Sequence, residues 1–392
     1  MGVVETSDAR VADIAAAAAT CAAESERQHH LDAPVVEALV RSGLAGLVAP
    51  TALGGCAAHP GRLVEVVEEV ARADGSAGWS VGIGIGSNYL AGIVPRADRE
   101  GGVPGHERAG RRAAHAGGPR PGQRRRVPAL RRWKYASGCR HAAIAASGVM
   151  IFDGEKPELN PDGSPDVRLA ILTEDQFSVE ETWDTVGMRG TGSNDITATD
   201  VPLPRERIGT LWDPMWPDDA IFRLRAFDML GPCLGSVPLG IGRAALDIVT
   251  STIDDQSSSS PAPGRRLALA DDPVAHLEFG RAAMRLHGAR CSLLDAVDDA
   301  YQHAVVGDQP PRAVSARIGL ACLEAMSAGL AAVDTSCALT GSASIRPDSI
   351  LDRMRRDLAT ARTHVMFSSR LAVALGRQLA GSDTVAFPFL PV

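Results

Sequence analysis

Few residues of this chain stand in a spacing that would support chemistry by itself. Cys139 and His141 form a single C-x-H pair, and the chain's 7 cysteines contain no C-x-x-C. Structural zinc sites usually combine two such pairs, so a turn that follows a strand is the better interpretation of this one. We therefore expect no metal site.

A second candidate is the glycine-rich run Gly82–Gly86, which reads G-I-G-I-G. It lacks the full G-x-G-x-x-G spacing of a dinucleotide-binding loop, no strand pattern precedes it, and a helical pattern already runs into it. Small residues in this setting favour close packing between helices. The sequence therefore shows no nicotinamide site.

A third stretch, Trp183–Asp195, contains three glycines and leads into an alternating run. Ile196 and Ala198 point to one side of that run and Thr197 to the other, which is typical of a half-buried strand. Pro202 ends the strand because it has no N–H to donate to a ladder. By spacing alone, this is a glycine-rich turn that enters an edge strand.

The residues of this third stretch, W-D-T-V-G-M-R-G-T-G-S-N-D, resemble the central β domain of the acyl-CoA dehydrogenase superfamily. More narrowly they resemble its branch of flavin-dependent two-component monooxygenases, which includes the oxygenase component of p-hydroxyphenylacetate hydroxylase, dibenzothiophene monooxygenase and the amino-sugar nitrososynthases. Residues 133–142, W-K-Y-A-S-G-C-R-H-A, are similar to that branch's W-x-F-A-S-G-C-x-H-A. The two motifs follow the family's order at about its separation.

The resemblance implies a mainly α fold with a central β domain. We expect a helical N-terminal domain at 1–132, a β-barrel or sandwich at 133–218, and a C-terminal four-helix bundle at 219–392. The family is usually a homotetramer. Apolar spacing and breaks predict C-terminal helices at 220–256, 272–306, 311–338 and 346–380.

The superfamily catalyses two very different reactions. Acyl-CoA dehydrogenation needs a carboxylate base, in most members a glutamate near the start of the last helix. The last glutamate of this chain is Glu324, and residues 340–352 supply none. Asp254 and Asp255 lie near the alternative position of the base, but they are shorter and we expect them to be solvated. The carboxylate reaction therefore lacks its base.

The resemblance implies a monooxygenase instead. Such an oxygenase component takes reduced FAD or FMN from a separate flavin reductase, and the flavin reacts with O2 to a C4a-hydroperoxide that oxidises a small, aromatic or polycyclic substrate. Two alternatives stay open: an acyl-CoA dehydrogenase with a displaced base, and a non-catalytic relative.

Two residues carry the implied catalytic roles. Arg356–His364 resembles the branch's R-D-x-x-x-x-x-x-H on the last helix, which implies that His364 lies over the flavin near the peroxide. The resemblance also implies that Ser137 contacts the flavin near N5 and that the backbone of Tyr135 and Ala136 flanks the ring. Without it, His364 would be a histidine on a helix face and Ser137 a serine that opens a turn.

Further flavin contacts are implied at other places. Arg265 or Arg266 would reach the flavin phosphates of a neighbouring subunit, because guanidinium pairs well with phosphate. Solvated loop charge is the alternative for at least one of them. Gly341 and Ser342 stand where the family meets the nucleotide end of the flavin. Finally, A-D-G-S-A-G-W, which ends at Trp79, is similar to the helix that walls the family's active site.

Residues 96–132 depart from the family pattern. They are rich in arginine, glycine and proline and show almost no apolar periodicity. A disordered basic loop, a divergent insertion and a slipped reading frame all fit, and we favour the last because recognisable patterning returns abruptly at Trp133. A nucleic-acid patch fits least, since no stacking aromatics interleave.

Composition limits the remaining classes. A net charge of -7 gives no reason to expect nucleic acid, and no run approaches the ~20 apolar residues of a membrane span. The N-terminus lacks the basic and apolar regions of a secretory signal. Scattered cysteines fit a reducing compartment, so we expect a cytoplasmic protein.

Overall fold

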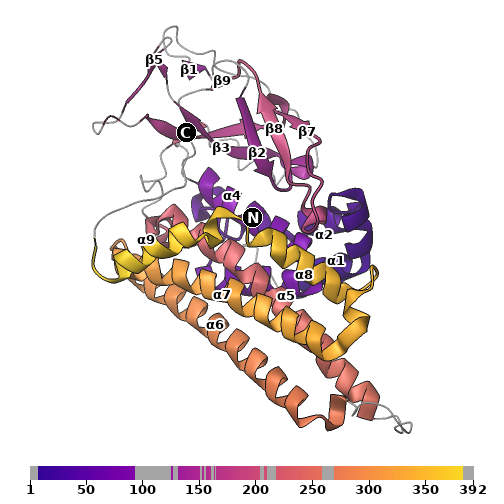
Figure 1. Ribbon diagram of the computed structural model, residues 1–392. Coiled ribbons are helices and arrows are strands. Elements are labelled where there is room, and N and C mark those ends of the chain that lie inside the picture. The colour runs from indigo at the N-terminus through magenta and orange to yellow at the C-terminus, as the bar shows by residue number, and fades with distance from the viewer. Residues whose placement is uncertain are drawn as a thin grey trace.

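The computed structural model describes residues 8–92, 125–126, 131–150, 152–153, 156–159, 163, 165–203, 207–209, 218–257 and 269–382. Every structural statement below concerns this part of the chain. Most of the anomalous stretch 96–132 lies outside it, and so do Arg265 and Arg266. Helices come first along the chain, strands follow, and long helices complete it, with the sheets at one end of the helical body (Figure 1).

Side-chain caps fix the ends of the first helices. Asp32 accepts a hydrogen bond from the backbone N–H of Ala33, and Gly43 ends the same helix with a φ of 70°. Asp74 likewise accepts from the N–H of Ala77 at 2.8 Å and begins the helix that carries Trp79. The four N-terminal helices are α1 (Asp8–Gln28), α2 (Ala33–Ser42), α3 (Pro60–Ala73) and α4 (Gly75–Ala91).

The strands form two three-stranded antiparallel sheets, in the orders β10-β6-β3 and β2-β8-β7, and two short two-stranded pairs. Ile196 and Ala198 on β8 are buried, as their alternation predicts. The predicted edge strand is wrong, because β8 pairs with β2 on one side and β7 on the other. The strands are β1 (Arg125–Arg126), β2 (Arg131–Ala136), β3 (Ile144–Met150), β4 (Phe152–Asp153), β5 (Lys156–Pro157), β6 (Val167–Thr173), β7 (Ser178–Glu180), β8 (Asn194–Ala198), β9 (Pro202–Leu203) and β10 (Ile208–Gly209).

Three of the four predicted C-terminal helices are confirmed as α5 (Ala226–Ser257), α6 (Pro273–Val305) and α7 (Arg312–Thr340). The predicted single helix 346–380 is wrong, because the chain forms α8 (Ile350–Ala361) and α9 (Ser369–Leu379) with a link between them. In that link His364 accepts from the N–H of Met366, and Ser368 caps α9 by accepting from the N–H of Leu371, so a separate helical segment begins after each of them.

The core joins the two helical parts. Helix α5 packs against α3, α4 and α7, and α4 also contacts β3 of the sheets. Glu68 on α3 is buried and pairs with Arg243 of α5 at 2.8 Å and with Arg290 of α6 at 2.7 Å. By length and composition α5 and α7 could each cross a membrane, but 78% and 61% of their apolar windows are buried in the protein.

Candidate active site

One indole ring brings Ser137 and His364 together. Trp79 on α4 is only 6% exposed, and its Nε1–H donates to the Oγ of Ser137 at 3.1 Å. The same ring meets the imidazole of His364 edge to face, with 5.5 Å between the ring centroids and 76° between the planes. The β domain, the N-terminal helices and the C-terminal helices therefore each supply one of the three side chains.

A bulge in β2 places Ser137. The pairing of β2 with β8 shifts between Trp133 and Ala136, and Tyr135 within the bulge has a φ of 64°. A non-glycine residue with positive φ is strained and persists only where its surroundings enforce it. Such bulges re-aim side chains next to functional sites. The predicted flavin-flanking residues Tyr135 and Ala136 thus form the local structure that positions Ser137.

An exposed aromatic residue, Tyr135, lies two residues before Ser137 in the chain. Tyr135 is 69% exposed and meets Trp183 edge to face at 6.2 Å between ring centroids. The Nε1–H of Trp183 donates to the carbonyl of Met188 at 2.9 Å, which fixes its ring. An exposed and a half-buried aromatic side chain that meet close in the chain to a half-buried hydroxyl fit a planar ligand with polar edges. These residues therefore fit the isoalloxazine ring that the resemblance implies.

His364 is held as a neutral imidazole. Its Nδ1 accepts a hydrogen bond from the backbone N–H of Met366 at 3.3 Å, so in the neutral ring the proton is on Nε2. Burial lowers the pKa of His364 to about 4. At neutral pH the side chain therefore offers one N–H donor without positive charge.

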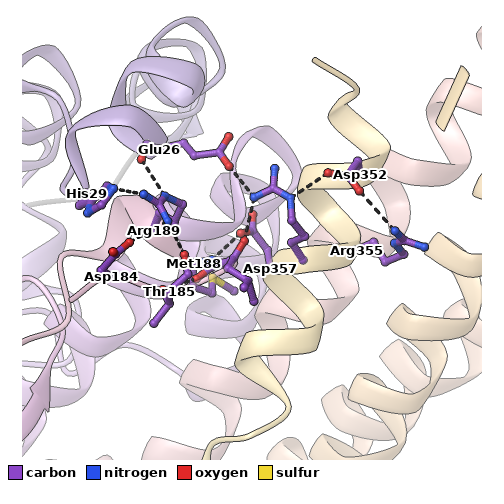
Figure 2. Close-up of polar contacts among 12 residues, drawn as sticks. Glu26, His29, Asp184, Thr185, Met188, Arg189, Asp352, Arg355 and Asp357 are labelled. Atoms are coloured by element: carbon purple, nitrogen blue, oxygen red, sulfur yellow. Dashed lines mark hydrogen bonds and ion pairs between the residues drawn. The ribbon is translucent and has the colours of Figure 1, made fainter. Parts of the chain in front are cut away.

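The glycine-rich loop lies between α1 and α8 (Figure 2). A Cβ on Gly187 would stand 2.0 Å from the carbonyl oxygen of Arg356 on α8, so only glycine allows this approach. Arg189 reaches the carbonyl of Glu26 on α1 and contacts Nε2 of His29. Arg356 in turn donates to the carboxylate of Glu26 at 2.5 Å.

Two buried carboxyl groups support this junction. The Oδ1 of Asp357 accepts from the N–H of Met188 at 2.5 Å, and Asp74 caps α4. Burial first, and the nearby Asp74 second, raise the pKa of Asp357 to about 7. Burial also raises the pKa of Asp74. Both carboxyls bind backbone amides, and among the described residues no Asp or Glu hydrogen-bonds to Ser137 or His364.

A row of hydroxyl groups continues from Ser137 into the glycine-rich stretch. The Oγ of Ser137 lies 2.7 Å from that of Ser193, which lies 2.6 Å from the Oγ1 of Thr191. Thr191 donates to the carbonyl of Met188 at 2.8 Å. Sequence reasoning missed these partners, although both hydroxyl residues stand inside the quoted motif beside glycines.

The other predicted contacts are not brought to Ser137. Gly341 and Ser342 are exposed before the start of α8, whereas His364 follows its end, and a 12-residue helix spans about 18 Å. Their role at a flavin stays a prediction, as does that of Arg265. Asp254 is exposed on α5, so nothing places it as a displaced base. Within the described ranges no three His, Cys, Asp or Glu side chains gather to hold a metal.

Comparison with known proteins agrees with this architecture. Family models of the acyl-CoA dehydrogenase N-terminal and C-terminal domains match residues 6–95 and 232–369. The chain is similar to indole-3-acetate monooxygenase of Pseudomonas putida, with 30% identity over 367 residues that cover 91% of this chain and 90% of that protein. It is also similar to the flavin-dependent monooxygenase oxygenase subunit HsaA of Rhodococcus jostii, with 25% identity over 354 residues that cover 88% and 90%.

A solved structure that contains a bound flavin shares this fold. XiaF from Streptomyces sp., in complex with FADH2 and glycerol, superposes with a TM-score of 0.81 and 26% identity, covering 99% of this chain and 96% of that chain. The fold and family that the two motifs imply are therefore confirmed. The chain belongs to the flavin-dependent monooxygenases that have the acyl-CoA dehydrogenase fold.

Proposed function

We propose that the chain is an oxygenase component that receives reduced flavin from a separate reductase and transfers one oxygen atom from O2 to an aromatic substrate of the indole type. The observation that carries the proposal is the contact of Trp79 with both Ser137 and His364. It joins a hydroxyl and a neutral imidazole at a site where no described carboxylate offers a base. Proton abstraction from an acyl thioester would need that base.

The cofactor supplies the oxygen chemistry, because reduced flavin activates molecular oxygen. The protein's own side chains orient the reacting groups and donate or accept hydrogen bonds. The Nε2–H of His364 can donate to a developing oxygen anion without carrying charge into the site, and the Oγ of Ser137 can accept from a ring N–H. The ring of Trp79, which contacts both side chains, is only 6% exposed, so little of this contact is open to water.

The substrate class follows from the relatives and from the site. The P. putida relative is named for indole-3-acetate, and in this chain the aromatic ring of Trp79 bonds to the Ser137 hydroxyl and meets His364. Aromatic edges favour aromatic substrates over aliphatic ones. Whether FAD or FMN serves is decided by the same assay, run with each reduced flavin.

The assay combines the chain with a generic flavin reductase, NADH and a panel of indoles, phenols and aliphatic acids. We expect hydroxylated product from members of the aromatic set, and peroxide alone from the aliphatic acids. Release of all consumed oxygen as hydrogen peroxide with every compound would contradict the proposal. Bleaching of bound oxidised flavin by an acyl-CoA without oxygen would favour the dehydrogenase alternative.

We also propose a homotetramer that works in the cytoplasm. Helix α6 carries an outward stripe of exposed apolar side chains, Val274, Leu277 and Met284, at helical spacing. None of the 7 cysteines, all of which lie within the described ranges, forms a disulfide, which suits a reducing compartment. Light scattering should give four times the chain mass, and Met284→Glu should lower it; a monomeric parent would contradict the assembly.

A further inference from the structure

The row of hydroxyls behind Ser137 has a fixed proton direction. Its three oxygen–oxygen contacts, from Ser137 to Ser193, from Ser193 to Thr191 and from Thr191 to the Met188 carbonyl, measure 2.7, 2.6 and 2.8 Å. Each contact needs a proton between its two oxygens, because lone pairs that face each other at such distances repel. Three hydroxyl protons are present for three contacts, so every one of them is used.

The carbonyl at the end decides which way the protons point. A carbonyl has no proton, so Thr191 must donate to Met188. Ser193 must then donate to Thr191, and Ser137 to Ser193. The reverse order would leave two oxygens 2.8 Å apart with no proton between them. Thr191 and Ser193 are only 2% and 4% exposed, so solvent does not reorder the row.

Ser137 is therefore an acceptor on its remaining side. Its proton is committed to Ser193, and the indole N–H of Trp79 can only donate to it. A hydroxyl oxygen has two acceptor lone pairs, and Trp79 takes one. Among the described hydrogen bonds, no second protein donor reaches the half-buried Ser137 hydroxyl, so a ligand that contacts it there would have to supply a hydrogen-bond donor.

We propose that Thr191 and Ser193 are positioning residues that hold Ser137 as an acceptor, and that they thereby make the site prefer reduced over oxidised flavin. The N5 atom of a reduced flavin carries a hydrogen, whereas N5 of an oxidised flavin has a bare lone pair that would face the lone pair of Ser137. The inference rests on the proposed function, which sets the flavin ring against this serine. It also explains why the oxygenase would release the oxidised flavin, which the reductase then reduces again.

The test compares two substitutions at one buried position. Thr191→Val keeps the shape and removes the hydroxyl, so Ser193 can donate back and Ser137 can turn its proton toward the ligand. Thr191→Ser keeps the row intact. Thr197→Val on β8 removes a hydroxyl that bonds only to Glu180 and serves as the control. For each protein, dissociation constants are measured for oxidised flavin in air and for reduced flavin without oxygen.

The parent should bind reduced flavin more tightly than oxidised flavin. Thr191→Val should lower this ratio of affinities about tenfold, because one hydrogen bond contributes ~1.4 kcal/mol. For a two-electron couple, this tenfold loss corresponds to a fall of ~30 mV in the midpoint potential of the bound flavin relative to the parent. Thr191→Ser and Thr197→Val should keep the parent's ratio. Ser193→Ala, which removes the acceptor of the Ser137 proton, should match Thr191→Val, and it carries the test if the valine variant does not fold.

The outcomes separate the two claims. If the parent binds flavin and transfers oxygen while Thr191→Val and Ser193→Ala keep the parent's ratio of dissociation constants, the proton order is refuted and the proposed function stands. If the parent binds neither form of flavin, both are refuted. An equal loss in Thr191→Ser would mean that packing, not the hydroxyl, sets the preference, and would overturn the inference as well.

Discussion

Asp357 is a buried carboxyl whose charge should control stability between pH 4 and pH 8. Its Oδ1 accepts from the N–H of Met188 at 2.5 Å, and Asp74 lies close enough to raise its pKa further. Asp357→Asn keeps an oxygen acceptor for Met188 and removes the charge. The substitution therefore isolates the cost of ionising this group under the glycine-rich loop.

The size of the effect follows from the two pKa values. In the unfolded chain an aspartate loses its proton near pH 3.9, whereas burial holds the folded pKa of Asp357 at about 7. Between these values the folded protein binds the extra proton, so its stability falls as pH rises, by ~1.4 kcal/mol per pH unit. At pH 8 the penalty is on the order of 4 kcal/mol, and near pH 4 it vanishes.

Urea unfolding followed by tryptophan fluorescence at pH 5 and pH 8 measures this difference. Asp357→Asn should be more stable relative to the parent at pH 8 than at pH 5, by roughly 3 kcal/mol. Asp334→Asn, an exposed position on α7, is the matched control and should show no such change. A difference between Asp357→Asn and the parent that is equal at the two pH values would refute the reasoning, because the folded carboxyl would then already be ionised at pH 5.

Three further predictions concern the site and its support. Trp79→Phe removes the donor to Ser137 but keeps a ring against His364, so stability should fall by only about 1–2 kcal/mol while the ratio of product to peroxide drops. Because burial lowers the pKa of His364 to about 4, its ring NMR signals should not titrate between pH 8 and pH 5.5; a midpoint near 6.5 would contradict the buried placement. Glu68→Ala leaves Arg243 and Arg290 without their buried partner and should cost about 3 kcal/mol in urea unfolding, whereas a loss below ~1 kcal/mol would mean that the pair is solvated.

The helices were predictable where their signals are local. Asp32 and Gly43 cap α2 with the residue types that favour such caps, and the predicted ranges 272–306 and 311–338 match α6 and α7. The interruption at His364 was missed because the apolar spacing of 346–380 continues through it. Only the side-chain caps of His364 and Ser368 reveal the new direction, and such caps compete with helix propensity in ways that spacing does not encode.

The site was predictable only in part. Ser137 and His364 were chosen by resemblance, and the structure brings both to Trp79. Ser193, directly before β8, reaches Ser137, directly after the neighbouring strand β2 of the same sheet, and Asp357 accepts from the backbone of Met188, 169 residues earlier in the chain. Position along the chain says nothing about such contacts. The predictions for Arg265 and for most of residues 96–132 fall outside the described residues, so they stay predictions.

The most direct measurement of the central claim is a single turnover with isotopically heavy oxygen gas. The chain is first loaded with reduced flavin and an indole-type substrate without oxygen. It is then mixed with the labelled gas while flavin absorbance is recorded, and the mass of the product is measured by mass spectrometry. We predict one labelled oxygen atom in the product and a delay before oxidised flavin appears, and we expect His364→Ala and Ser137→Ala to lose both. Immediate reoxidation with all the label in peroxide, or label-free product, would contradict it.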